Sequence, residues 1–271
     1  MIKSIVLIGS GNVATHLGIA LKKVGCKIDQ VYSPNKEHAA ILAKKLKTKS
    51  CSTIESINQE ADLYIMAVKD DAITELTQHL KLQTSPQPSR KVGTSTPKER
   101  GKIIVHTSGS ASMEVLKNVS KNIGVFYPLQ TFSKDIKVEI NQVPFCIEAN
   151  NKATEKLLIQ LAKTISYNVN IVSSEQRKTI HVAAVFACNF SNHLFSISEK
   201  ILNDNKISFD ILKPLIYETI YKIEKHSPTQ VQTGPAKRKD KKTIQAHLEF
   251  LKTYPEFRKI YRELSESIEK A

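Results

Sequence analysis

The sequence contains no tryptophan, and it has only four cysteines among its 271 residues. The cysteines stand far apart and form no C-x-x-C pair, which argues against a zinc knuckle, a redox pair and a disulfide framework. No uninterrupted apolar run reaches the roughly eighteen residues that a membrane span needs. The first residues also lack the long apolar segment of a secretory signal, so we expect a cytoplasmic protein with no membrane partner.

Acidic residues are scarce relative to basic ones: 26 Asp and Glu stand against 40 Lys and Arg, which gives a net charge of +14. Such a balance suits nucleic acid, membrane surfaces or anionic small molecules. The lysines are spread along the chain, and where they thicken, at 44–49, 90–102 and 237–242, no aromatic residues alternate with them to stack on bases. We therefore expect no nucleic-acid partner, and a lysine-rich surface that favours phosphorylated or acidic small molecules.

Short apolar runs alternate with helical patterns over the first two thirds of the chain. This alternation predicts an α/β domain of the Rossmann type, with a parallel, doubly wound sheet over 1–172. A polar stretch at 83–102 carries one large apolar residue and predicts a mobile insertion in that domain. The strand candidates are 4–8, 28–32, 63–68, 103–106, 123–126, 145–148 and 169–172.

The last third of the chain shows only long helical patterns, which predicts an all-helical domain over 173–271. Its helices are expected through 182–197 and at 210–225, 240–252 and 256–269. Capping signals mark three helix starts: Ser52-x-x-Glu55 predicts one near Thr53, Ser173-x-x-Gln176 a second, and Asp240 a third. A helical array this small often gains core by dimerising, so we expect a homodimer through this domain.

The stretch from Gly9 to Ala14 reads G-x-G-x-x-A, directly after an apolar strand and at the start of a patterned helix. In such a turn the first glycine permits the tight bend, the second lets the backbone approach a phosphate, and Ala14 lets helix and strand pack closely. The free N–H groups of the helix start then bind the pyrophosphate of a dinucleotide. The alternative is a purely structural turn. The expected backbone contacts are Gly9, Ser10, Gly11, Asn12 and Val13.

The end of the second strand indicates which dinucleotide fits. An acidic residue there would bind the ribose 2′-hydroxyl of NAD, whereas this sequence has Ser33, Asn35 and Lys36 and no carboxylate. NADP(H) is therefore favoured over NAD(H), with these three side chains as phosphate contacts. The alternative is that Lys36 is only a solvated lysine in the first helical turn.

Ligands of such sheets bind beyond the carboxyl ends of the strands, and polar residues follow three of the predicted strands. Asp70 and Ser110 have the alternative role of capping the helices that follow. The candidates for contacts with the nicotinamide end or a substrate are Val68, Lys69, Asp70, Thr107, Ser108 and Gln130.

Polar residues also interrupt the first helix of the second domain. His181, Cys188 and Asn192 share one helix face, with Asn189 some way round it. They are either a proton donor and a substrate anchor, or core polar groups satisfied by neighbouring helices. Further on, Thr233, Gly234 and Arg238 lie in a loop of anion-compatible groups, where Arg238 either binds a carboxylate or phosphate or forms a structural ion pair.

Several motifs occur together in order: GSGNVATHL from Gly9, HTSGS around Ser108, FYPLQTFS around Gln130, HVAAVFACNFSNHL from His181 and QTGPAKRKD from Gln232. Together they resemble the Rossmann-like, DUF2520-containing family of NADP-dependent oxidoreductases, over nearly the whole chain except the insertion at 83–102. That family is related in fold to 6-phosphogluconate dehydrogenase, 3-hydroxyisobutyrate dehydrogenase and pyrroline-5-carboxylate reductase. The resemblance implies a helical C-terminal domain of the 6-phosphogluconate dehydrogenase type, which commonly forms the dimer interface.

Two positions depart from the related proteins. Relatives often carry an arginine directly after the serine of the second strand, where this chain has Pro34. The hydroxyacid dehydrogenases carry a catalytic lysine four residues before an asparagine, and here Val185 stands four residues before Asn189. Their mechanism therefore does not transfer to this chain.

The sequence leads to the hypothesis of an NADP-dependent reductase with no metal, which passes hydride between the nicotinamide and a small carbonyl, imine or hydroxy acid in an inter-domain cleft. Ser108 would orient the substrate, His181 would act as general acid and Asn189 would position it. Arg238 or Gln130 would hold an acidic end of the substrate. The alternative is a non-catalytic NADP(H)-binding sensor whose helical domain presents a surface to a partner.

Overall fold

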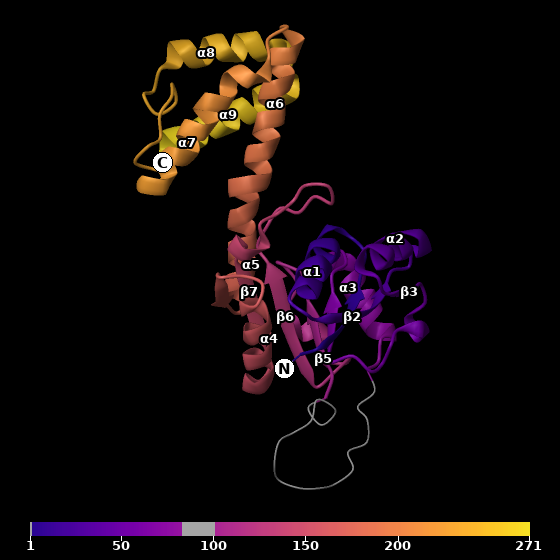
Figure 1. The fold of residues 1–271 in the computed structure, drawn as a ribbon. Coiled ribbons are helices and arrows are strands. Elements are labelled where there is room, and N and C mark those ends of the chain that lie inside the picture. The colour runs from indigo at the N-terminus through magenta and orange to yellow at the C-terminus, as the bar shows by residue number, and fades with distance from the viewer. Residues whose placement is uncertain (1, 83–100) are drawn as a thin grey trace, which may run out of the picture. The chain divides into compact units, whose positions relative to one another are not determined.

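The computed structural model describes residues 2–82 and 101–271 (Figure 1). The chain divides into two compact units, Met1–Phe186 and Ala187–Ala271. This division falls further along the chain than the predicted boundary after Val172, because the helix that follows Val172 contacts the sheet unit. The predicted mobile insertion lies outside the described residues, apart from its last two positions.

An eight-stranded sheet forms the centre of the first unit, in the order β3-β2-β1-β4-β5-β6-β7-β8. The fold class is the predicted Rossmann type, and neighbouring strands are parallel except for β6 and β7, which run antiparallel. The short outer strand β3 was not predicted. The strands are β1 (Ser4–Ile8), β2 (Lys27–Tyr32), β3 (Lys49–Cys51), β4 (Leu63–Met66), β5 (Ile103–His106), β6 (Asn122–Pro128), β7 (Phe145–Ala149) and β8 (Val169–Ile171).

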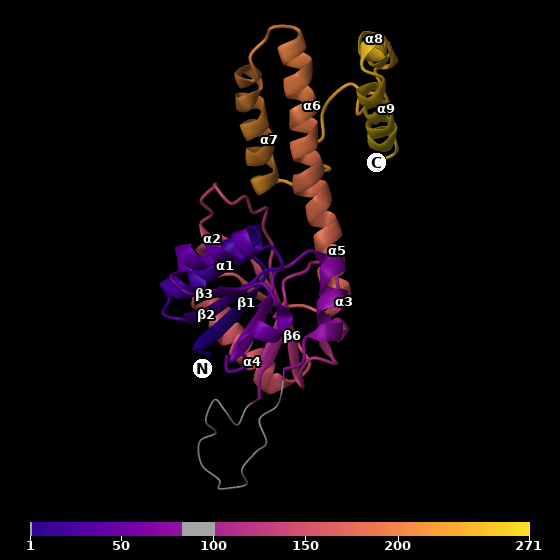
Figure 2. The same ribbon diagram turned by 90° about the vertical axis from the view of Figure 1, so that its right-hand side faces the viewer.

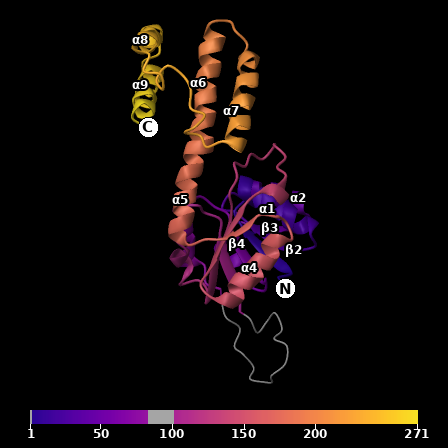
Figure 3. The same cartoon turned by 90° about the vertical axis from the view of Figure 1, so that its left-hand side faces the viewer.

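Helices cover both faces of the sheet (Figures 2 and 3). On one face, α1 (Asn12–Lys23), α2 (Lys36–Leu46) and α4 (Lys152–Lys163) pack against the odd-numbered side chains of β1, such as Leu7. On the other face, α3 (Asp70–His79) and the 3-10 turn Met113–Leu116 pack against the even-numbered side chains, such as Ile8. The sheet unit therefore has two apolar cores, one on each side, as a doubly wound sheet requires.

The predicted helix start near Thr53 is wrong. Thr53 precedes only the 3-10 turn Ile54–Ser56 and makes no side-chain capping bond, and the chain is extended after this turn. Gln30 explains this, because its side-chain amide donates to the carbonyl oxygen of Ser56 at 2.9 Å and its side-chain oxygen accepts from the amide of Asn58 at 2.7 Å. The backbone groups that would continue a helix are bound to the neighbouring strand instead.

The other two predicted caps are confirmed. Ser173 and Gln176 form a reciprocal capping box at the start of α5 (Ser174–Ala184), and the Asp240 side chain accepts from the Thr243 amide at the start of α8 (Lys241–Phe250). Both short polar side chains satisfy amide groups that the first helical turn leaves without an intrahelical partner.

Helix α5 continues through a π-helical segment, Val185–Phe190, into α6 (Ser191–Asp204). The π-helical segment holds one extra residue per turn and contains the candidate Asn189. By length and composition alone, the whole stretch Ser174–Asp204 passes for a membrane span, and none of its most apolar window is buried. Polar residues interrupt this stretch, so it contains no long uninterrupted apolar run that would mark it in the sequence.

The second unit consists of helices, with a long loop at 226–240 between α7 and α8. After α6 come the 3-10 turn Phe209–Leu212 and α7 (Lys213–Lys225), then α8, the 3-10 turn Leu251–Thr253 and α9 (Pro255–Lys270). These helices confirm the predicted ones to within a few residues. Among the described residues of this unit, the buried apolar side chains are Ala236, Leu248 and Leu251.

Candidate functional site

The glycine turn after β1 has the conformation that the motif predicts. Gly9 has a φ of +121°, and a Cβ at this position would collide with the carbonyl group of Ala67. Gly11 precedes the first residue of α1, and a Cβ added to it would meet nothing within 4 Å. The helix start has no side-chain cap and no acidic residue in its first turn. Its amides, at Asn12 and Val13, therefore face open space where an anion can bind.

The loop after β6 lies along the start of α1. The Asn12 side-chain amide donates to the carbonyl oxygen of Phe132 at 2.7 Å, and His16 stacks on the Phe132 ring with 5.0 Å between centroids. His16 Nε2 also lies 2.9 Å from the carbonyl oxygen of Ser133. The Asn12 side chain thus holds this loop, which leaves its backbone amide as the group available to a phosphate.

The three candidates at the end of β2 lie together but have different surroundings. Ser33 is buried, and its amide donates to the Cys51 carbonyl oxygen at 3.1 Å. The Asn35 side chain caps α2 by accepting from the His38 amide at 2.9 Å. Lys36, the first residue of α2, is exposed. Among these three, the ammonium group of Lys36 is the charged group that a 2′-phosphate would meet.

The loop after β5 is bound together by its own serines. Ser108 Oγ accepts from the amides of Ser110 at 3.1 Å and Ala111 at 2.9 Å, which leaves the hydroxyl hydrogen of Ser108 to donate. Ser110 Oγ donates to the carboxylate of Asp70, the first residue of α3. Neither Ser110 nor Asp70 caps a helix, which corrects that alternative. The Asp70–Ser110 hydrogen bond joins the ends of β4 and β5 instead.

His181 on α5 lies against this loop. Its Nδ1 atom is 3.1 Å from the Tyr127 hydroxyl oxygen at the end of β6, and the two rings meet edge to face at 6.1 Å. A Cβ added to Gly109 would approach His181 Nδ1 to 2.5 Å, so the loop backbone packs directly on the imidazole. The structure therefore places His181 against the loop that contains Ser108. The sequence hypothesis assigned both residues to the same substrate.

A buried ion pair fixes α5 to the sheet. Arg177 is fully buried, and its guanidinium group bonds to the carboxylate of Glu148 on β7 and to the carbonyl oxygen of Ala111. Ser174 also donates to Glu148 at 2.9 Å. The pair holds the base of α5 between β7 and the loop after β5, and so positions His181 one turn further along the helix.

His106, the last residue of β5, is a buried neutral group. Burial first, and the positive charge of Arg177 second, lower the pKa of His106 from 6.5 to about 4. Its Nδ1 atom accepts from the Ser108 amide at 3.1 Å, so the ring hydrogen resides on Nε2. His106 therefore shapes the loop after β5 and carries no charge at neutral pH.

Sequence reasoning missed Tyr127, Arg177 and Glu148 as partners in this arrangement. Tyr127 had a weak signal, since it follows an apolar strand whose end was expected to line the site. Arg177 and Glu148 had none, because a charged residue in an amphipathic pattern is normally exposed. Only the three-dimensional pairing of α5 with β7 makes them a buried pair.

Most of the remaining candidates are exposed, but Thr107 is buried, and Val68 and Gly234 are half-buried. Gln130 follows β6, with its side-chain oxygen accepting from the Thr131 amide at 2.8 Å. Asn189 and Asn192 are exposed on the long helix, which corrects the alternative that neighbouring helices of this chain bury them. Thr233 and Arg238 are exposed in the loop before α8, where Gly234 has a φ of +108°.

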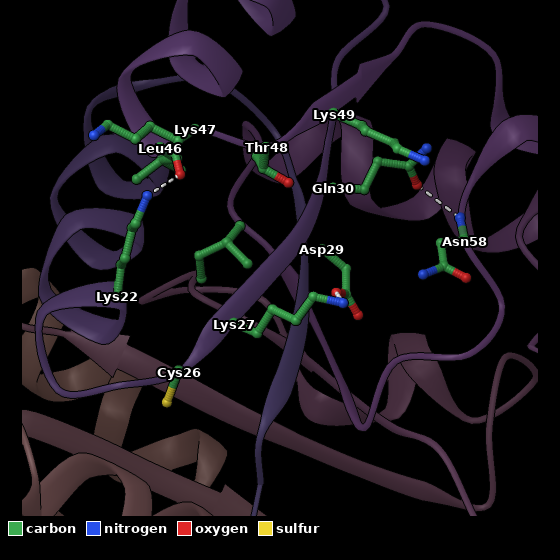
Figure 4. A pocket seen from close by; sticks show the side chains of 11 residues that line it. Lys22, Cys26, Lys27, Asp29, Gln30, Leu46, Lys47, Thr48, Lys49 and Asn58 are labelled. Atoms are coloured by element: carbon green, nitrogen blue, oxygen red, sulfur yellow. Dashed lines mark hydrogen bonds and ion pairs between the residues drawn. The ribbon is translucent and has the colours of Figure 1, made fainter.

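A cavity of about 610 Å³ lies elsewhere in the sheet unit, and none of the predicted site residues lines it (Figure 4). It lies where β2 and β3 begin, at the opposite end of these strands from the glycine turn. Several of its polar groups are paired with each other: Lys27 with Asp29 at 2.6 Å, Gln30 with the Asn58 amide, and Lys22 with the carbonyl oxygen of Leu46. Within 2–82 and 101–271, no group of three or more His, Cys, Asp or Glu side chains is arranged to hold a metal ion.

Comparisons with known proteins agree with this architecture. The profile of a Rossmann-like domain matches residues 2–130, and that of a domain of unknown function, DUF2520, matches residues 143–268. No curated protein matches the chain.

Solved structures extend the match to the whole length. A Bacteroides fragilis protein, provisionally described as an NADP oxidoreductase, is 38% identical with a TM-score of 0.89, over 99% of this chain and 98% of its own. A Thermotoga maritima protein is 22% identical with a TM-score of 0.70, over 97% and 99%. Pyrroline-5-carboxylate reductase from Streptococcus pyogenes shares the fold at 13% identity and a TM-score of 0.62, over 99% and 98%. The chain thus belongs to the family of Rossmann-like proteins that carry a DUF2520 domain.

Proposed function

We propose that this protein is an oxidoreductase that binds NADP(H) and transfers hydride between the nicotinamide and a small carbonyl, imine or hydroxy-acid substrate. The observation that carries the proposal is the uncapped start of α1, where Gly9 and Gly11 leave the first amides open to a diphosphate. The relative from Bacteroides fragilis, which is 38% identical and described as an NADP oxidoreductase, supports the same function.

The end of β2 supports NADP(H) over NAD(H). No carboxylate stands at Ser33, Asn35 or Lys36 to bind a ribose 2′-hydroxyl, and the exposed ammonium group of Lys36 attracts a 2′-phosphate. Pro34 takes the place where relatives often carry an arginine, so Lys36 supplies the positive charge in this chain.

The chain's own groups supply the proton chemistry. When bound, the nicotinamide supplies or accepts the hydride. His181 donates a proton to the oxygen or nitrogen atom of the reduced bond, since an imidazole can act as a general acid. The free hydroxyl hydrogen of Ser108 orients the substrate. Asn189 positions it, and Gln130 or the loop with Thr233, Gly234 and Arg238 binds its acidic end.

The cofactor proposal is tested by titrating the protein with NADPH and NADH in a calorimeter. Gly11→Asp places a carboxylate at the helix start without a clash, so we expect it to abolish NADPH binding and leave the thermal midpoint unchanged. Gly25→Asn, at the other end of the helix and with a φ that asparagine tolerates, is the matched control and binds normally. Binding of neither coenzyme to the unaltered protein would overturn the proposal.

A turnover assay distinguishes the reductase from the alternative, a non-catalytic sensor. The alternative is favoured by Val185, which stands where the hydroxyacid dehydrogenases carry a catalytic lysine. We expect NADPH oxidation with one member of a panel of oxo acids and cyclic imines. His181→Ala should abolish this turnover with coenzyme affinity intact. Tight coenzyme binding without turnover of any panel member would favour the sensor.

We also propose that the helical unit pairs with a second copy of the chain. Large apolar side chains are exposed on its helices and on the turn after α6, and a second copy would cover them. They are Phe190, Phe195, Ile207, Ile211, Leu215, Tyr217, Ile220, Tyr221, Ile223, Phe250 and Leu264.

Light scattering after gel filtration tests the pairing. We expect the mass of two chains for the unaltered protein and of one chain for Leu215→Glu. Ile136→Glu is the control, because it places the same charge on an equally exposed apolar side chain of the sheet unit. A single-chain mass for the unaltered protein, or its flotation with lipid vesicles, would overturn the pairing.

A further inference from the structure

The pairing of Tyr127 with His181 extends the proposed function, on which this inference rests. We propose that Tyr127 is a positioning residue: its hydroxyl group binds His181 Nδ1 and so leaves Nε2 as the atom that carries the proton to the substrate. Tyr127 lies in the FYPLQTFS motif without a role assigned to it there, and the pairing joins the end of β6 to α5 across a long stretch of chain.

Two neighbours restrict the imidazole near its Nδ1 atom. The Tyr127 hydroxyl oxygen lies 3.1 Å from Nδ1, and the Gly109 backbone leaves no room for even a Cβ beside the ring. The buried pair of Arg177 and Glu148 holds the helix on which His181 stands. The ring is thereby restricted in rotation, with Nδ1 engaged and Nε2 as its remaining proton-carrying atom.

The tyrosine hydroxyl remains protonated throughout the neutral range. Burial is the largest cause that raises the pKa of Tyr127, to about 12. Among the described residues, His181 Nδ1 is the partner that the structure gives this hydroxyl. In the neutral pair the Tyr127 O–H therefore donates to Nδ1, and the ring hydrogen of His181 resides on Nε2.

The same pair accommodates the charged imidazole. When His181 takes up a second proton, Nδ1–H donates to the Tyr127 oxygen after the hydroxyl group rotates. Transfer of the Nε2 proton to a substrate oxygen or nitrogen atom then leaves the Nδ1–H bond to Tyr127 intact. Tyr127 gives up no proton in this sequence and acts only through His181.

Nitrogen NMR of the full-length protein labelled with 15N-histidine tests the hydrogen bond without substrate or coenzyme. The His181 signals are assigned by their loss in His181→Ala. At a pH where the ring is neutral, we expect a protonated Nε2 and an Nδ1 shifted by hydrogen bonding. Tyr127→Phe moves Nδ1 to the position of a free acceptor, whereas Tyr167→Phe, at a tyrosine 87% exposed, leaves it unchanged.

Kinetics test the consequence for catalysis. With a substrate in hand, Tyr127→Phe lowers kcat about tenfold or more and leaves KM for NADPH within about twofold, because misorientation affects proton transfer and not coenzyme binding. Gly109→Ala places a Cβ against the imidazole, displaces the ring and gives the same loss of kcat.

An unchanged Nδ1 signal in Tyr127→Phe, or a neutral ring protonated on Nδ1, overturns the hydrogen bond. Full kcat in Tyr127→Phe overturns the positioning role while the reductase function stands. If none of the panel substrates supports NADPH oxidation by the wild-type protein, the reductase function is overturned. The NMR comparison still decides whether the hydrogen bond exists.

Discussion

The two units of this chain differ in where they place their apolar side chains. In the sheet unit, β1, β4 and β5 are almost wholly buried, and two clusters of apolar residues fill both faces of the sheet. In the helical unit most of the described apolar side chains are exposed or only half-buried, although its helices are well formed and largely as predicted. A sequence can therefore form regular helices in a unit that does not close an apolar core of its own.

The exposed apolar surface of the helical unit is the physical reason for proposing that it pairs with a second copy. Helices in water gain most of their stability from packing an apolar face, and isolated short helices are marginal. The sheet unit has buried that surface within one chain. The helical unit has not, and a second copy is the proposed source of the missing contacts.

The largest expected effect comes from breaking the buried ion pair of the sheet unit. Arg177→Ala leaves Glu148 without its partner and should lower the free energy of unfolding by about 3–5 kcal/mol. Arg262→Ala, at an exposed arginine of α9, should change it by less than about 0.5 kcal/mol. Urea unfolding measures both. Equal effects of the two variants would show that the buried pair contributes no more than surface charge.

Matched leucines test the burial difference directly. Leu63→Ala, at a fully buried leucine on β4, should cost about 2–5 kcal/mol through lost contacts and a cavity. Leu215→Ala, at a leucine 64% exposed on α7, should leave the stability of a single chain nearly unchanged and weaken self-association. Urea unfolding at two protein concentrations distinguishes the stability of a single chain from the stability gained by self-association. A concentration-independent cost at Leu215 would mean that α7 already packs within its own chain.

Acid should destabilise the sheet unit through His106. Its folded-state pKa of about 4 lies below the usual 6.5, so the unfolded chain binds the proton more readily. Stability is fully present above about pH 6.5 and falls by about 3 kcal/mol as the pH drops to 4. His106→Gln should flatten this slope in urea unfolding across that range. His193→Gln, on an exposed histidine of α6, should leave the slope as it is.

The smallest effect compares one cap in each unit. Asp240→Ala removes the acceptor for the Thr243 amide, and Ser173→Ala breaks the capping box of α5, each at a cost of about 1 kcal/mol. If the units unfold separately, calorimetry will show each variant lowering a different transition. A shift of one common transition by both variants would show that the two units unfold together.

The sequence predicted the elements whose signals are local. The strands 4–8 and 103–106 were placed correctly, because strands buried on both faces appear as continuous apolar runs. The strand Lys49–Cys51 was missed, since a three-residue strand at a sheet edge that begins with Lys and Ser carries no such signal. The antiparallel direction of β7 was also missed, because pairing direction is not written in hydrophobic pattern.

The candidate site divides in the same way. The glycine turn was predictable because strand, turn and helix start are adjacent in the chain. The contact of Tyr127 with His181 and the pair of Arg177 with Glu148 each join segments far apart in sequence, so they depend on how α5 packs on the sheet. The sequence shows that these residues are polar, but only the fold shows which of them contact each other.

The short outer strands of the sheet have a consequence for how this protein behaves when concentrated. β3 and β8 are three residues long, and β3 begins with a lysine. Proteins aggregate by pairing strands at unpaired sheet edges. Short edge strands and charged residues at the edge disfavour this pairing. The sheet edges therefore give little template for fibre growth, and the proposed pairing of helical units would form a complex that ends at two copies.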